Sequence, residues 1–175
     1  MASRFASLVA CMAFVGFASA ADKVPQVGDA PPDIPLQATQ IDKVLPDSKA
    51  KTISLKDFKG KKNVVLFYFP KAMTPGCTLE SCGFRDLISK FDKADTVIIG
   101  FSPVTLDKQE QFTKKENLNF PLIADPEKKL ITALGVKARS TWVIDKEGKI
   151  VKIYEKVSGP GKHPQEVFEV VEKLK

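Results

Sequence analysis

Residues 63–91 read NVVLFYFPKAMTPGCTLESCGFRDLISKF, and their pattern is the clearest sign of the expected fold class. Its first part, Asn63–Phe69, is dominated by β-branched and aromatic side chains, which is typical of a strand buried on both faces. Pro70 ends this run, and residues 71–76 are rich in turn-forming residues. Beyond Cys77, apolar residues recur at the spacing of one helix face, at Phe84, Leu87, Ile88 and Phe91. The stretch therefore predicts a central strand, a loop and an amphipathic helix.

The same alternation of strands and helices continues on both sides of this stretch. Downstream, the pattern predicts strand 95–102, helix 106–117, strand 120–124, helix 126–134, strand 141–145, a turn at 146–148, an antiparallel strand 149–154 and helix 163–175 with Pro164 at its first position. Upstream, Asp33–Thr39 and Lys51–Ser54 have the pattern of a peripheral hairpin. The expected fold class is α/β, with a mixed central sheet flanked by helices.

The length of the chain limits the number of domains, and its charge limits the kinds of partner that it can bind. The chain has 175 residues, is 43% apolar, and contains no repeat or linker, so residues 21–175 are expected to form one domain. Without residues 1–20, 26 positive side chains face 21 negative ones, a net charge of +5. The lysines are dispersed among carboxylates, and only two arginines, Arg85 and Arg139, occur beyond residue 20. This composition indicates a solvated surface and no nucleic-acid partner.

Residues 1–20 differ from the rest of the chain. Arg4 precedes an uncharged run from Phe5 to Ala20, which ends in the small residues Ala18-Ser19-Ala20. This pattern predicts a secretory signal peptide cleaved after Ala20, hence a secreted or periplasmic protein, or a plastid protein if the leader is bipartite. A transmembrane anchor is the alternative, but 16 apolar residues fall short of the roughly 20 needed, so no stable membrane insertion is expected. Lipidation at Cys11 is a further alternative.

Two cysteines, Cys77 and Cys82, remain beyond the leader. A structural disulfide is the default explanation in an oxidising compartment, whereas two cysteines and one histidine do not complete a structural zinc site. Cys77 lies about 20° from Phe84 around the helix, in the first turn, where free backbone N–H groups favour a thiolate. Five helical residues place the two α-carbons at least about 7.5 Å apart, whereas a disulfide needs under about 7 Å. The spacing therefore favours a thiol pair that reacts in turn, one of them after the helix opens.

Residues 70–77, PKAMTPGC, resemble the P-x3-T-x2-C motif of peroxiredoxins. Residues 77–86, CTLESCGFRD, and residues 139–145, RSTWVID, resemble the PrxQ, or bacterioferritin comigratory protein, branch of that family. The resemblance implies a thioredoxin-like fold. It also implies that Cys77 is the peroxidatic thiolate, that Thr74 binds thiolate and peroxide, that Arg139 stabilises the anion, and that Pro70 shields the site from water.

The resemblance further implies a reaction cycle. Cys77 would reduce hydrogen peroxide or an organic hydroperoxide and become a sulfenic acid, which Cys82 would resolve to an intramolecular disulfide. A thioredoxin-like dithiol would then reduce the disulfide. The protein would need no metal or organic cofactor, and it is expected to be a monomer.

Each of these residues also has a simpler interpretation. Thr74 and Pro70 could merely shape the loop, and Arg139 and Arg85 could form ion pairs at the surface. His163, the only histidine, is expected to be a helix cap or a surface residue, which excludes a mechanism built on an internal histidine base. Two rival functions are a thiol–disulfide oxidoreductase, although its C-x-x-C motif is absent, and a redox-controlled chaperone or sensor.

Overall fold

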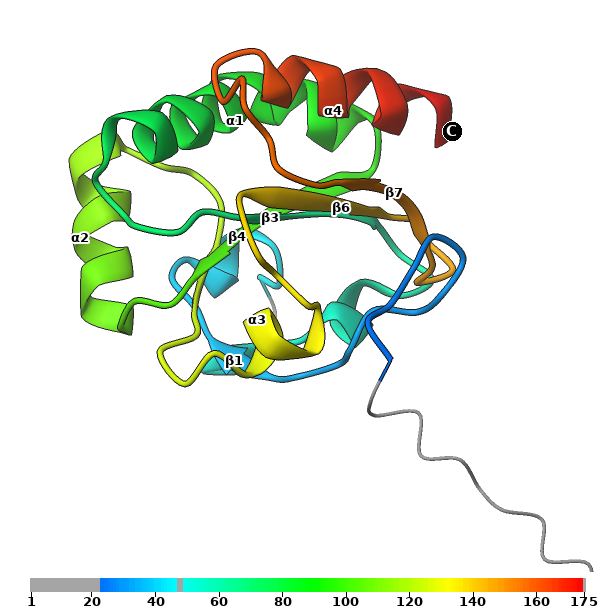
Figure 1. Cartoon of the computed structure of the whole chain (residues 1–175), viewed down its shortest axis with the longest axis horizontal. Helices are drawn as coiled ribbons and strands as arrows, with labels where there is room; N and C mark the ends of the chain where they lie inside the picture. The colour runs from blue at the N-terminus through cyan, green and yellow to red at the C-terminus, as the bar shows by residue number, and fades with distance from the viewer. Residues whose placement is uncertain (1–22, 47–48, 175) are drawn as a thin grey trace, which may run out of the picture.

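The computed structural model describes residues 23–46 and 49–174 (Figure 1), so the predicted signal peptide lies outside the described residues. The strands are β1 (Leu36–Gln37), β2 (Thr52–Ile53), β3 (Asn63–Tyr68), β4 (Thr96–Ser102), β5 (Leu122–Ala124), β6 (Ser140–Ile144) and β7 (Ile150–Tyr154). The α-helices are α1 (Pro75–Lys93), α2 (Leu106–Glu116), α3 (Lys129–Ala133) and α4 (His163–Val171). Short 3₁₀ helices are η1 (Ile41–Lys43), η2 (Leu55–Phe58) and η3 (Glu172–Leu174).

The central sheet has the strand order β5-β4-β3-β6-β7. β3 pairs in parallel with β4, and β4 with β5, whereas β6 and β7 run antiparallel to their neighbours. β3 is the middle strand, and all six of its residues are buried. The mixed sheet and the central position of the strand that opens the quoted stretch are therefore as predicted.

Helices cover one face of the sheet, and smaller elements cover the other (Figure 1). Alternate residues of β3 point to opposite faces. Val65 and Phe67 pack in the cluster formed with α1, α2 and α4. Leu66 and Tyr68 pack in the cluster formed with α3, η2 and the small sheet. The sequence of β3 is apolar without interruption because each face of this strand packs in a core of its own.

Several element boundaries differ from those predicted. The peripheral hairpin exists as the antiparallel pair β1 and β2, but each strand has only two residues. The helix expected over 126–134 is shortened to α3, because Lys128 adopts a left-handed conformation with φ 57°. The Asp125 carboxylate then accepts hydrogen bonds from the amides of Lys129 and Ile131. None of the helices in the described part of the chain is long and apolar enough to cross a membrane.

Candidate active site

Cys77 lies in the first turn of α1, which follows β3 after a short loop. The connecting loop turns sharply at Met73, whose φ of 61° is left-handed, and Thr74 then precedes the helix in an extended conformation. Pro75 starts the helix, where its missing N–H costs nothing. Cys77 is 1% exposed and is a free thiol. The fold therefore presents this sulfur at the positive end of a long helix, as the sequence predicts.

Arg139 contacts the sulfur from the position directly before strand β6. Because β6 pairs with β3, with Ser140 opposite Tyr68, the residue before β6 lies beside the start of α1. Arg139 Nη2 donates a hydrogen bond to Cys77 Sγ over 3.1 Å. The side chain is 14% exposed, so the interpretation of Arg139 as a surface ion-pair partner is wrong.

Glu80 is a residue of this site that the sequence analysis missed. Its side chain is fully buried and forms an ion pair with Arg139 Nη1, so the guanidinium joins Glu80 to Cys77. Burial raises the pKa of Glu80 to about 7, although the charge of Arg139 acts in the opposite direction. A signal was present in the sequence, because Glu80 lies three residues after Cys77 and hence on the same helix face.

Thr74 and Pro70 occupy the loop before α1. The Thr74 hydroxyl donates to the carbonyl oxygen of Lys71 over 3.0 Å, so in this structure it shapes the loop and does not bond the sulfur. Pro70 is solvent-exposed at the end of β3. The direct roles that the resemblance implies for these two residues therefore stay predictions.

Cys82 lies one and a half turns further along α1 and is partly exposed. Its Sγ donates to the Glu116 carboxylate over 3.9 Å. Burial raises the pKa of the Cys82 thiol, and the negative charge of Glu116 adds to this effect. Arg85 lies nearby, but it pairs with Asp86 and bonds the carbonyl of Glu116, so it belongs to this surface and not to the Cys77 site.

The sequence profile of the AhpC/TSA family matches residues 27–153, which is well over half of the chain. The chain belongs to the AhpC/TSA family. It is 39% identical over 146 residues to peroxiredoxin Bcp of Bacillus subtilis, with 75% of this chain and 86% of that protein covered. It is 36% identical over 155 residues to the chloroplastic peroxiredoxin Q of Populus jackii, with 84% of this chain and 68% of that protein covered.

Solved structures agree with this assignment. Peroxidoxin BcpB of Mycobacterium tuberculosis matches with a TM-score of 0.76 and 26% identity, covering 86% of this chain and 99% of that chain. The bacterioferritin comigratory protein of Xanthomonas campestris, studied for its alkyl peroxide reduction, matches with a TM-score of 0.73 and 27% identity, covering 87% and 98%. The predicted thioredoxin-like α/β fold is confirmed, and the chain is a peroxiredoxin, a thiol-dependent peroxidase.

His163 is buried in this peroxiredoxin, so the expectation that it is a cap or a surface residue is wrong. It is 1% exposed, and its Nε2 shares a hydrogen bond of 2.8 Å with Thr141 Oγ1. The rings of Phe84 and Tyr154 meet it edge to face. Burial lowers the pKa of His163 to about 4, with a further contribution from the charge of Arg139. The aromatic pocket holds a neutral imidazole, since a charged ring would lose its hydration there.

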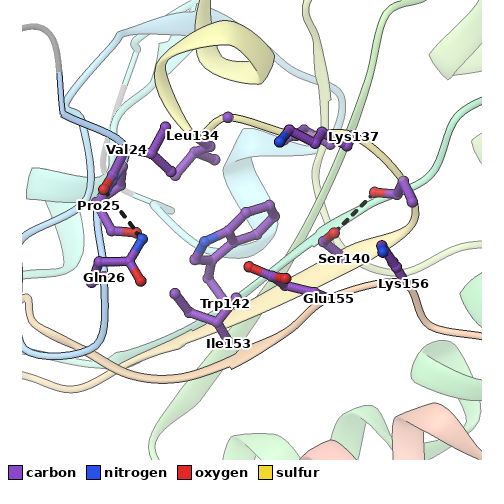
Figure 2. A pocket seen from close by; sticks show the side chains of 13 residues that line it. Val24, Pro25, Gln26, Leu134, Lys137, Ser140, Trp142, Ile153, Glu155 and Lys156 are labelled. Atoms are coloured by element: carbon purple, nitrogen blue, oxygen red, sulfur yellow. Dashed lines mark hydrogen bonds between the residues drawn. The ribbon is translucent and has the colours of Figure 1, made fainter.

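A hollow of about 300 Å³ lies on the face of the sheet opposite to the one that α1 and Cys77 cover (Figure 2). The indole of Trp142 stands within it, beside Leu134 and Ile153. These side chains belong to the core that packs under α3, whereas Cys77 belongs to the core under α1. The hollow therefore does not lead to the sulfur of the peroxiredoxin site.

Proposed function

We propose that Cys77 is the peroxidatic residue of this enzyme. Its thiolate attacks the O–O bond of a hydroperoxide, so the sulfur is oxidised to a sulfenic acid and the departing oxygen leaves as water or an alcohol after taking up a proton. The observation that carries the proposal is the 3.1 Å contact between Arg139 and a buried cysteine at a helix N-terminus. The guanidinium is placed to stabilise both the thiolate and the negative charge that develops on the departing oxygen.

We also infer that Cys82 resolves the sulfenic acid within the same chain. The Cys82 thiol attacks the Cys77 sulfur, so a disulfide forms and water leaves. Both residues lie in α1, and the third cysteine of the chain falls in the predicted leader. Resolution therefore needs no second subunit, which fits a monomer. It does require the turns between Cys77 and Cys82 to unwind, since a regular helix keeps the two α-carbons too far apart.

The proposed substrates are hydrogen peroxide and organic hydroperoxides, and a thioredoxin-like dithiol regenerates the enzyme. The relative from Xanthomonas campestris is described for alkyl peroxide reduction, which supports the organic substrates. The disulfide must be reduced by two thiols to close the cycle, and a protein dithiol supplies both at one site. In the proposed cycle, the two cysteine sulfurs are the protein atoms that change oxidation state. The proposal assigns no role to a metal or an organic cofactor.

Peroxide consumption with and without a dithiol tests this function. We expect turnover only with the dithiol, no reaction for Cys77→Ser, and a single turnover for Cys82→Ser. Reduction of protein disulfides without peroxide would favour a thiol–disulfide oxidoreductase. Prevention of aggregation without peroxide consumption would favour a redox-controlled chaperone. Equal residual activity in both serine variants would remove the distinction between the two cysteines.

For location, we propose export of the protein with cleavage after Ala20, as the small residues Ala18-Ser19-Ala20 suggest. The mature protein would act in a periplasm or outside the cell, and a plastid is the alternative destination. N-terminal sequencing of protein from its native source should find Ala21 first. An intact Met1 would contradict export, and a lipid on Cys11 would favour lipidation.

A further inference from the structure

The hollow around Trp142 (Figure 2) is formed by three parts of the chain. Its floor is the sheet, where Trp142 of β6 lies opposite Ile153 of β7. Leu134, at the end of α3, and the segment Val24–Gln26 form walls around this floor. The volume of about 300 Å³ fits a molecule of roughly ten non-hydrogen atoms, if each takes about the 30 Å³ of a water molecule in the liquid.

The wall formed by the N-terminal segment is fixed by close packing. Gly135 has a left-handed φ of 64°, and a Cβ added to it would lie 2.6 Å from Val24 Cγ2. Only glycine leaves room for Val24 at this position. The amide of Gly28 donates to the carbonyl of Ile150 over 2.8 Å, and the amide of Ile150 donates to the carbonyl of Asp29 over 2.9 Å. The segment is therefore also bonded to β7, and the hollow is a preformed part of the fold.

The indole N–H of Trp142 is a hydrogen-bond donor that the protein itself does not use. Trp142 is 3% exposed, and its ring stands within the hollow (Figure 2). None of the hydrogen bonds within the described part of the chain involves this N–H. Buried tryptophan N–H groups usually have a partner. A molecule in the hollow that carries a hydrogen-bond acceptor would satisfy this donor.

Three charged side chains stand at the rim of the hollow, namely Lys137, Lys156 and Glu155. All three are exposed, and among the described residues none of them has an ion-pair partner. Lys156 adopts a left-handed conformation with φ 55°, and the amide of Val157 then donates to the carbonyl of Arg139 over 2.9 Å. This turn holds residues 155 and 156 at the rim. Two positive side chains against one negative give the rim a net charge of +1, which favours an anion.

We propose that this hollow is a binding site for a small carboxylate with an apolar body, of about the size of octanoate. The body lies on the apolar floor, where it removes the surfaces of Trp142, Leu134 and Ile153 from water. A carboxylate only accepts hydrogen bonds, which suits a hollow whose free donors are the indole N–H and two ammonium groups. The site does not rest on the proposed function, because the hollow and Cys77 lie on opposite faces of the sheet.

Titration with octanoate tests the proposal, because the chain contains a single tryptophan and its indole N–H gives one signal in an NMR spectrum of the labelled protein. We expect this signal to shift in a saturable way, with a Kd of at most about 1 mM, as for roughly ten atoms bound with ordinary efficiency. Octanol and octylammonium have the same alkyl chain without the negative charge. They should bind at least about tenfold more weakly.

Variants at the rim test the part played by charge. Lys137→Gln and Lys156→Gln should each weaken octanoate binding about threefold, and Glu155→Gln should strengthen it by a similar factor. These side chains are exposed, so the substitutions should leave the fold intact. Lys152→Gln is the matched control in β7, because the ammonium of Lys152 lies 5.4 Å from the ring of Tyr154, on the other face of the sheet. It should leave the affinity unchanged.

Two further variants test where the octanoate lies. Val24→Ser makes one wall polar and should weaken binding about threefold. Val27→Ser is its control, since Val27 is 59% exposed in the same segment and does not line the hollow. Cys77→Ser should bind octanoate as tightly as the wild type, because the sulfur lies in the other core.

Each contrary result would overturn the proposed site. Absence of a saturable shift would show that the hollow does not take the ligand. Equal binding of octanoate, octanol and octylammonium, or equal effects of Lys152→Gln and the rim variants, would show that the rim does not select an anion. Loss of octanoate binding in Cys77→Ser would place the ligand at the sulfur. Peroxide consumption is measured separately, so failure of this site would leave the proposed function untouched.

Discussion

The Nη2 of Arg139 lies 3.1 Å from the Sγ of Cys77, although 62 residues separate them in the chain. The same guanidinium pairs through Nη1 with the buried Glu80. Arg139 therefore contacts two groups of the same helix: the sulfur of Cys77, which we propose reacts with peroxide, and the Glu80 carboxylate in the next turn. This arrangement places a fixed positive charge at the sulfur without exposing it to water.

Replacing Arg139 by alanine should slow the reaction of Cys77 with peroxide about a hundredfold, the usual effect of removing one charged donor from a developing anion. The fold should survive because Glu80, with its pKa already raised to about 7, can take up a proton when its partner is lost. Arg85→Ala is the matched control, since Arg85 pairs with Asp86 away from Cys77. An equal loss in both variants would argue against a direct role of Arg139.

Glu80→Gln should separate the position of Arg139 from its charge. The neutral amide loses the ion pair, so we expect the rate constant with peroxide to fall about tenfold as the guanidinium becomes less well oriented. Stopped-flow kinetics with peroxide measures this effect. Glu127→Gln, at an exposed position, should leave the rate constant unchanged. An unchanged rate constant in Glu80→Gln, or an equal loss in Glu127→Gln, would contradict the positioning role.

The stability of the protein should depend on pH through His163. The pKa of His163 is lowered to about 4 in the folded state, against 6.5 for the free side chain, so the unfolded chain binds more protons between these values. The stabilisation by the neutral ring is fully present above about pH 6.5 and is lost as the pH falls towards 4, by up to about 3 kcal/mol. Urea unfolding at several pH values should show that the free energy of unfolding rises with pH between about 4 and 6.5, and the slope of this rise is the quantity to compare. His163→Gln keeps a donor for Thr141 but does not titrate, so its slope should be smaller. An unchanged slope would mean that other groups cause it.

Cys82 should react slowly with alkylating reagents at neutral pH, because its raised pKa keeps the thiol protonated. The measurement is made in a Cys77→Ser variant that lacks residues 1–20, in which Cys82 is the remaining cysteine. Glu116→Gln removes the nearby negative charge and should increase the alkylation rate by a few fold. Glu110→Gln, on the same helix α2, is the control and should have no effect. No response to Glu116→Gln would leave burial and the charge of Asp86 as the causes of the low reactivity.

The sequence predicted the elements with the strongest local patterns. The strand β3 and the helix α1 were predicted correctly. A strand buried on both faces has a continuous apolar run, and a helix buried on one face has an apolar stripe, and both patterns are visible in the local sequence. Cys77 was also placed correctly at the start of a helix, since the loop residues and Pro75 mark that boundary. The end of a short helix was less predictable. Lys128 adopts a left-handed conformation that no local pattern announces, and α3 is shorter than expected for this reason.

The sequence alone was enough to place two cysteines on one helix, at a separation that forbids a disulfide while the helix is intact. What surrounds the two cysteines could be seen only in the folded structure. Pairing of β6 with β3 brings Arg139 to Cys77, and the same arrangement buries Glu80 and His163, two residues whose roles the sequence did not show. The packing of Pro164 on Gly83 likewise joins residues 81 positions apart. Such contacts depend on how layers of the fold meet, and a linear pattern holds no record of residues that become neighbours only through packing.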